Sequence, residues 1–165
     1  EVGPDGVVRA AFPNAEYVVQ KGEIDFARTD NERIRASYIK DDFEPVAAER
    51  GRLRTVEGPV SWTDEVRFEL APGHTPWLQI VLVVTRRGTV AFIADLVPTA
   101  SHLRMAWIMG YDVEPLRTLD SKKQILPRAL AEGWVLVFEL DVEMALGDLE
   151  QRDRRIGARA WQPEG

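Results

Sequence analysis

Two nearly continuous apolar runs in the middle of the chain constrain its fold more than any other feature. Residues 78–85 (LQIVLVVT) and 89–93 (TVAFI) are short and rich in β-branched residues, and only Arg86, Arg87 and Gly88 separate them. Two such runs joined by a tight turn are typical of a β-hairpin. Because apolar residues occupy both alternating sets of positions, the pattern predicts central strands that are covered on both faces of a sheet.

Shorter strands and helices are expected on either side of this hairpin. Alternating or β-branched stretches predict further strands at residues 16–20, 53–56, 65–70 and 134–138. Helical periodicity predicts short helices at residues 23–28, 32–39 and 142–149, the second of them capped by Asn31. The mixture indicates an α/β (α+β) fold with a mixed sheet and flanking helices.

A longer helix is expected in the last third of the chain. Asp112 can cap its start, and Gly133 can end it in the left-handed conformation. Its apolar stripe is formed by Leu116, Leu119, Leu126 and Leu130. Pro127 lies inside the helix, where it removes a backbone donor and should kink it.

No repeat or flexible linker divides the 165 residues, so one domain is expected over residues 1–165. Residues 1–11 are rich in turn formers and predict a loop that leads into the fold. Residues 151–165 predict a solvated tail.

Composition excludes several classes of partner. With 21 Lys and Arg against 27 Asp and Glu, the formal charge is -6, which disfavours binding to nucleic acid and to anionic membrane surfaces. The apolar runs are far shorter than the roughly 20 residues that span a bilayer, and no basic-then-apolar leader opens the chain. We therefore expect a cytoplasmic protein. Because cysteine is absent, a metal site would have to use His, Asp or Glu.

Two residues at strand ends are the candidates for chemistry. His74 follows a predicted strand in the sequence LAPGHTP, where Pro72 and Gly73 form a turn. Asp95 ends the apolar strand VAFIAD. By themselves these residues fit a turn histidine and a helix-capping aspartate at least as well as they fit a metal site.

The order of the surrounding motifs is more specific than either residue. Pro-Gly-His-Thr, a hairpin, an apolar strand ending in Asp-Leu-Val-Pro-Thr, then His-Leu and Gly-Tyr-Asp follow one another along the chain. From about Phe12 to about Leu149 this order resembles the metallo-β-lactamase superfamily, in particular its lactonase-like and esterase-like hydrolases. The resemblance implies part of an αββα sandwich and a site for one or two Zn²⁺ ions.

The resemblance also implies roles for individual residues. His74 and Asp95 are similar to metal ligands of the family, and Asp95 matches the carboxylate that bridges two metals and thereby serves catalysis. Tyr111 and His102 lie where family members place groups that contact the substrate, and Tyr111 would also take part in catalysis. Alternatively, Tyr111 only anchors the start of the helix and His102 is a surface residue.

Three departures from the family pattern limit what the chain is expected to do alone. No histidine precedes His74, so the family's His-x-His-x-Asp-His segment is absent. Leu140 stands where a late strand usually carries a histidine ligand, and Trp77 replaces a usual glycine. A catalytic zinc typically needs three protein ligands. Glu139 and Asp141 flank Leu140, but neighbouring strand residues point to opposite faces, so neither is expected to replace the lost ligand.

These observations leave three hypotheses. The chain is the C-terminal portion of a metallo-β-lactamase-fold hydrolase that is not catalytically competent alone. Alternatively, it belongs to a split or processed zinc hydrolase of esters or lactones, completed by an N-terminal fragment that carries the histidine-rich segment. The third hypothesis is an unrelated α/β binding module. Because a missing first sheet would leave a strand edge open, we also expect a partner, either that N-terminal fragment or a second copy in a homodimer.

Overall fold

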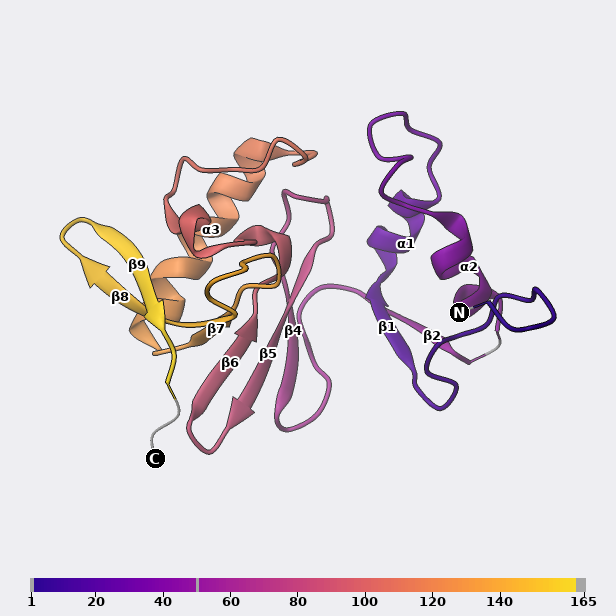
Figure 1. Cartoon of the computed structure of the whole chain (residues 1–165), viewed down its shortest axis with the longest axis horizontal. Helices are drawn as coiled ribbons and strands as arrows, with labels where there is room; N and C mark the ends of the chain where they lie inside the picture. The colour runs from indigo at the N-terminus through magenta and orange to yellow at the C-terminus, as the bar shows by residue number, and fades with distance from the viewer. Residues whose placement is uncertain (1, 50, 163–165) are drawn as a thin grey trace. The chain divides into compact units, whose positions relative to one another are not determined.

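The computed structural model describes residues 2–49 and 51–162, and the chain divides into two compact units (Figure 1). The first unit is Glu1–Glu57 and the second is Gly58–Gly165. The sequence predicts one domain over the whole chain, whereas the structure has two separate clusters of contacts. Each unit is described by itself.

The first unit is small and has two strands and two helices among its described residues. Its elements in chain order are β1 (Tyr17–Gln20), α1 (Lys21–Ala27), α2 (Lys40–Ala48) and β2 (Leu53–Val56). Strands β1 and β2 pair in parallel, with Tyr17 opposite Leu53. The buried apolar residues of this unit are Ile24, Ala27, Ile34 and Val46.

The helix predicted at residues 32–39 is wrong, because this segment forms turns and the second helix begins only at Lys40. Asn31 does act as a local cap: its side-chain oxygen accepts the amide of Arg33 at 2.8 Å. The segment then stops after one turn, in which Arg35 donates its amide to the carbonyl of Asn31. Helix α2 was missed because Pro45 interrupts its already weak apolar periodicity.

The second unit is built on one sheet of seven strands. Its elements in chain order are β3 (Val60–Ser61), β4 (Val66–Leu70), β5 (Gln79–Thr85), β6 (Gly88–Phe92), the short 3₁₀ helices η1 (Ala94–Leu96) and η2 (Ala100–Leu103), α3 (Pro115–Ala131), β7 (Val135–Val137), β8 (Leu146–Arg152) and β9 (Arg155–Ala160). The strands lie side by side in sequence order. Only β6 and β7 pair in parallel, because α3 connects them. The predicted mixed sheet with flanking helices is therefore confirmed.

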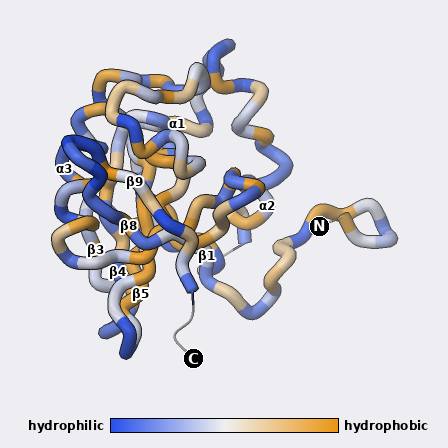
Figure 2. The backbone as a smooth tube through the Cα atoms, turned by 60° about the vertical axis from the view of Figure 1, so that its left-hand side comes forward, coloured by the Kyte–Doolittle hydropathy of each residue, from blue (hydrophilic) through white to orange (hydrophobic). Residues whose placement is uncertain are grey.

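One face of this sheet forms the core, and the other does not match the prediction. Ile80 and Leu82 of β5 and Ala91 of β6 are buried on the core face. On the opposite face, Phe92 of β6 is 38% exposed, and its neighbour Val81 of β5 is only half-buried. The expectation that both faces of these strands are covered is therefore wrong for this unit. Figure 2 colours each residue by hydropathy and shows apolar residues in β5 and hydrophilic residues in α3.

Helix α3 packs on the core face through a stripe that differs from the predicted one. Its buried residues are Thr118, Ser121, Lys122, Ile125, Leu126 and Ala129. Leu116, predicted to be part of the stripe, is instead 77% exposed. The predicted end is confirmed: Gly133 has φ 65°, and Trp134 donates its amide to the carbonyl of Ala129 at 2.9 Å, which closes a Schellman turn.

The helix predicted at residues 142–149 is wrong. Residues 151–155 of the predicted solvated tail are exposed, but residues 151–160 form the end of β8, a turn and β9 rather than an irregular tail. Asp141 accepts the amides of Glu143 and Met144, each at 3.0 Å, and this turn leads into β8 rather than into a helix. Gly147 then lies against the ring of Phe138, where an added Cβ would come within 2.9 Å of a ring carbon. Strands β8 and β9 form a hairpin at the edge of the sheet. Residues 163–165 of the predicted tail lie outside the described residues.

A fully buried lysine ties the loop after η2 to α3. The side chain of Lys122 is 0% exposed, and its ammonium donates hydrogen bonds to the carbonyls of Arg104 at 2.8 Å, Met105 at 3.3 Å and Trp107 at 2.8 Å. Burial lowers the pKa of Lys122 to about 8, and the charge of Asp112 opposes that shift. The three carbonyls keep this buried amine satisfied.

Replacing this lysine tests how much the loop depends on it. We expect Lys122→Met to lower the free energy of unfolding by about 3 kcal/mol, because three carbonyls lose their donor in the interior. Lys123→Met is the matched control: Lys123 is exposed and pairs only with Asp120, so its loss should change stability by about 0.5 kcal/mol at most. Urea unfolding measures both. Equal effects of the two variants would contradict a structural role for Lys122.

Candidate functional site

Three segments of the second unit bring His74, Asp95 and Asp112 together. His74 lies in the turn between β4 and β5, Asp95 in η1 directly after β6, and Asp112 just before α3. The imidazole stands between the two carboxylates: its Nδ1 lies 3.0 Å from Oδ1 of Asp112, and its Nε2 lies 3.3 Å from Oδ2 of Asp95. The prediction that His74 and Asp95 come together is thus matched by the geometry of the chain.

The turn that carries His74 is anchored to the start of α3. Gly73 has φ 145°, and a Cβ at this position would lie 2.2 Å from the backbone nitrogen of Thr118. Only glycine fits both the conformation and this close approach. The carbonyl of Gly73 accepts the amide of Glu114 at 2.8 Å, and the carbonyl of His74 accepts the amide of Val113 at 3.0 Å. The backbone of His74 is therefore held in place independently of its side-chain contacts.

Asp112 orients the imidazole of His74 through its contact with Nδ1. It is 5% exposed, and its second carboxylate oxygen accepts the hydroxyl of Thr118 in α3. The sequence predicts Asp112 as a helix cap, and this is wrong: the residue before the helix is Glu114, and no side chain caps it. A carboxylate on one imidazole nitrogen, which fixes the ring so that the other nitrogen faces a site, is the usual support of a metal-binding histidine.

Asp95 has one carboxylate oxygen to spare. Its Oδ2 faces His74, whereas its Oδ1 is buried and accepts no hydrogen bond from any residue that the structure describes. The preceding residue, Ala94, has φ 48°, which an L-residue with a side chain adopts at a cost. Strained backbone and an unsatisfied buried acceptor at the end of β6 are features that cluster at functional sites.

The residues around Leu140 divide between a structural and a site-facing role. Leu140 itself is 57% exposed, and its amide bonds the carbonyl of Pro98. Asp141 accepts the amide of Ala100 at 2.9 Å, and its bonds to backbone amides lower its pKa. Glu139 differs: burial raises its pKa, the charge of Asp95 raises it further, and His74 lowers it. Its carboxyl group therefore lies within electrostatic reach of the His74 cluster.

The two residues predicted to contact substrate are His102 and Tyr111. The Nδ1 of His102 lies 2.7 Å from the hydroxyl of Thr99, and burial, followed by the charge of Lys122, lowers the pKa of His102. Tyr111 is 79% exposed and makes no hydrogen bond to the part of the chain that the structure describes. Neither contacts His74 or Asp95 by a hydrogen bond, so their roles stay predictions. Trp77, the bulky residue in the turn after His74, is 41% exposed.

The donor set fits part of a zinc site. An imidazole nitrogen and a carboxylate are ligands that zinc accepts. Asp112 already supports the imidazole, and the free Oδ1 of Asp95 is an acceptor without a partner. The number of donors is too small, however: within residues 2–49 and 51–162, no group of three or more His, Asp or Glu side chains is arranged to hold a metal. The chain thus provides two ligand positions and their support, which we call the half-site.

Solved structures of metal-dependent hydrolases have the same fold. A probable metal-dependent hydrolase from Staphylococcus aureus matches 96% of this chain at a TM-score of 0.80 and 18% identity. The hydrolase AbOPH of the beta lactamase superfamily matches 99% at a TM-score of 0.80 and 18% identity. AidC, a dizinc quorum-quenching lactonase, matches 97% at a TM-score of 0.74 and 19% identity.

These likenesses show the fold: the chain has the architecture of metallo-β-lactamase-type hydrolases, as the order of its motifs predicts. It spans only 56% of the Staphylococcus aureus hydrolase, 63% of AbOPH and 61% of AidC. No protein-family model and no curated protein sequence matches the chain. Along its described residues, no helix has the length and apolar character needed to cross a membrane.

Sequence reasoning missed three residues that matter at or near the half-site. Asp112 was seen only as a cap, although its place in the sequence Gly-Tyr-Asp marks it as part of the resemblance. Lys122 gave a signal that could have been used, since it lies on the same helical face as Leu126 and Ala129 and a lysine there requires buried partners. Glu139 was considered only as a substitute for the ligand lost at Leu140, and its interaction with the charges of Asp95 and His74 depends on the tertiary fold.

Substituting Gly73 tests whether its close approach positions the half-site. We expect Gly73→Ala to lower the free energy of unfolding by about 3 kcal/mol or more, because the new methyl group overlaps backbone atoms of α3. Gly133→Ala is the comparison variant: its φ of 65° is also positive, but nothing lies within 4 Å of its Cβ, so it should cost only about 1 kcal/mol. Chemical denaturation measures the free energy of unfolding of both variants. If Gly73→Ala is as stable as Gly133→Ala, the proposed anchoring of the turn is contradicted.

Proposed function

We propose that this chain is the C-terminal portion of a metallo-β-lactamase-fold hydrolase and is not catalytically competent alone. One observation carries the proposal: His74 and Asp95 converge with their support in place, yet they provide only two ligands where a catalytic zinc typically takes three. A large separation of His74 and Asp95 would have supported the third hypothesis, an unrelated α/β binding module, but Nε2 of His74 lies 3.3 Å from Oδ2 of Asp95.

The residues of the half-site have separable tasks in this proposal. His74 offers Nε2 to the metal while Asp112 holds the opposite nitrogen, and Asp95 offers the oxygen that lacks a partner. When bound, zinc supplies an activated water and polarises the carbonyl group of an ester or lactone. Tyr111, exposed in the segment that follows Asp95, is the side chain that we assign to substrate contact, with His102 as the second candidate.

Metal content and turnover of the purified chain test the proposal. We expect less than one zinc per chain after zinc loading and gel filtration, because two ligands leave the ion mostly hydrated. Hydrolysis of a nitrophenyl ester and of an acyl homoserine lactone should equal that of His74→Ala. Stoichiometric zinc together with turnover that His74→Ala abolishes would overturn the statement that the chain is incompetent alone.

A second candidate is a split or processed zinc hydrolase in which another polypeptide completes the half-site. The buried Oδ1 of Asp95 favours it, because a metal held jointly with outside ligands would satisfy that oxygen. The strained Ala94 and the support from Asp112 favour it as well, since both are costly features that serve a ligand. The partner would be an N-terminal fragment with a His-x-His-x-Asp-His segment, or a second copy of the chain in a homodimer.

Complementation tests this candidate. The coding sequence directly upstream of Glu1 is read, and any His-x-His-x-Asp-His segment encoded there is co-expressed with the chain. We expect the complex to hold one or two zinc ions, and His74→Ala to lower zinc affinity by about 100-fold through loss of a ligand. His102→Ala, which removes the other histidine of the chain, should leave the zinc content unchanged. A complex without zinc, or equal zinc loss in both variants, would contradict the candidate.

A further inference from the structure

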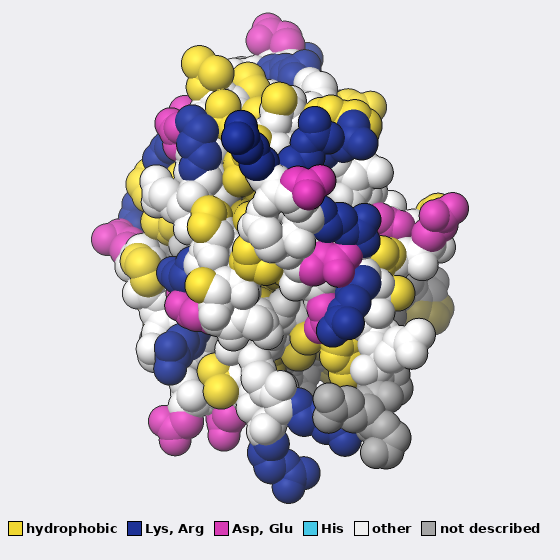
Figure 3. Space-filling model, turned by 90° about the vertical axis from the view of Figure 1, so that its left-hand side faces the viewer, with side chains coloured by type: hydrophobic (Ala, Val, Ile, Leu, Met, Phe, Trp, Pro, Cys, Tyr) yellow, Lys and Arg dark blue, Asp and Glu magenta, His cyan; other side chains and the backbone are white. Residues whose placement is uncertain are grey.

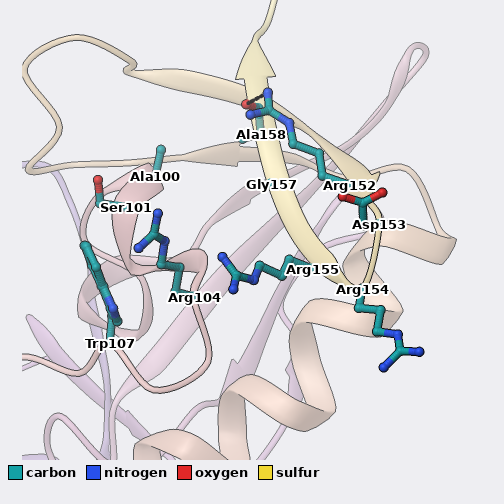
Figure 4. A pocket seen from close by; sticks show the side chains of 10 residues that line it. All are labelled: Ala100, Ser101, Arg104, Trp107, Arg152, Asp153, Arg154, Arg155, Gly157 and Ala158. Carbon is teal, nitrogen blue, oxygen red and sulfur yellow. Dashed lines mark hydrogen bonds between the residues drawn. The ribbon is translucent and has the colours of Figure 1, made fainter.

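A hollow lined by arginines lies between the η2 region and the β8–β9 hairpin of the second unit (Figure 4). It measures about 850 Å³ and shares no lining residue with the half-site. A smaller hollow of about 400 Å³ adjoins it and is lined by some of the same residues, among them Arg104 and Arg155. Figure 3 shows Lys and Arg side chains gathered across the face of the molecule seen in that view.

The charge of this hollow is opposite in sign to the net charge of the chain. Its lining includes Arg104, Arg152, Arg154, Arg155 and Asp153. The chain as a whole has a formal charge of -6. Four cationic side chains against one carboxylate make a local positive field that attracts anions.

The arginines are not all equivalent. Arg152 is already engaged, because it pairs with Glu150 and donates to the carbonyl of Ala158 at 3.1 Å. Arg104 and Arg155 have no acidic partner among the residues that the structure describes. In Figure 4, Arg155 extends from β9 toward Arg104, whereas Arg154 points away from the hollow. Arg104 and Arg155 therefore present two planar guanidinium groups to one space.

The backbone segments that carry Arg104 and Arg155 are held in place by contacts within the unit. Lys122 binds the carbonyls of Arg104 and Trp107, so the loop that carries both side chains is fastened to α3. The guanidinium of Arg104 stacks over the indole of Trp107, 4.4 Å from its centroid. The ladder between β8 and β9 holds Arg155 on the opposite wall, paired with Arg152. Preorganised donors lose little conformational freedom when a ligand binds.

We propose that this hollow binds a doubly charged oxyanion of the phosphate class. Two guanidinium groups that line one hollow repel each other, and an anion between them removes that repulsion while it accepts paired N–H bonds from each planar group. A dianion fits two arginines better than a monovalent carboxylate does. The volume exceeds that of a bare phosphate ion, and Trp107, 47% exposed, lies at the wall where the organic part of a phosphate monoester would rest.

An NMR titration of the whole chain tests the proposal. The probes are inorganic phosphate, acetate and phenyl phosphate, followed through the backbone amides and the Nε–H groups of arginine. We expect saturable phosphate binding at one site with shifts at Arg104 and Arg155, and weaker binding of acetate. Tighter binding of phenyl phosphate would identify an organic phosphate monoester as the ligand, and equal binding would identify the free ion.

Variants decide whether the site is specific. Arg155→Gln and Arg104→Gln should each weaken phosphate binding by about tenfold, the loss of one charge-assisted pair of hydrogen bonds. Arg67→Gln is the matched control, since Arg67 is an exposed arginine of the same unit that lines neither hollow. Amide spectra establish that each variant is folded. One folded variant is enough to test the proposal. Absence of saturation, unchanged binding in the folded variants, or equal weakening by Arg67→Gln would overturn the proposal.

Discussion

The contact between the turn at Gly73 and the first residues of α3 determines the candidate site. Because Gly73 lacks a side chain, its backbone can lie against Thr118, and the carbonyls of Gly73 and His74 then accept amides from the segment before the helix. This docking brings Asp112 beneath His74, although the two residues are 38 positions apart in sequence. The direction of the imidazole is thus a consequence of backbone packing.

The polar residues on the buried side of α3 extend this principle. Thr118 donates to Asp112, Ser121 donates to the carbonyl of Pro72 at 2.7 Å, and Lys122 donates to three carbonyls of the loop after η2. A helix that buried only apolar residues would contact the sheet equally well but would leave these loops without donors. Buried polar groups stabilise only when they are paired. Successive positions of α3 therefore secure the His74 turn and the wall of the arginine-lined hollow.

The sequence predicts the second unit well where burial alone decides the structure. The apolar hairpin β5–β6, strand β7 and the end of α3 at Gly133 follow from local patterns, and the order of motifs predicts the fold. Prediction failed where a long-range contact overrides local preference. Residues 142–149 have helical periodicity, yet the turn at Asp141 and the packing of Gly147 on Phe138 lead residues 146–149 into strand β8.

The candidate site was predictable only in part for the same reason. His74 and Asp95 stand at strand ends, where functional residues collect, and their motifs are short and local. Asp112 acquires its role through the docking of the His74 turn. Lys122 faces the core with a charge that only three backbone carbonyls, supplied by residues 15 to 18 positions earlier, can satisfy.

Energetics explains why the half-site is informative despite its missing ligands. The buried Oδ1 of Asp95 without a donor costs about 1–3 kcal/mol, and the left-handed conformation of Ala94 costs about 1–2 kcal/mol. Neither cost is recovered within the described chain. A cation that binds Oδ1 of Asp95 removes the cost of the unpaired oxygen. The cost at Ala94 is offset by any ligand that needs Asp95 in this orientation. Leu140 stands at the position of a family ligand and Trp77 at that of a usual glycine, and neither residue changes these two costs. In the split-hydrolase candidate, the completing donors would come from another polypeptide, and their binding would stabilise this region.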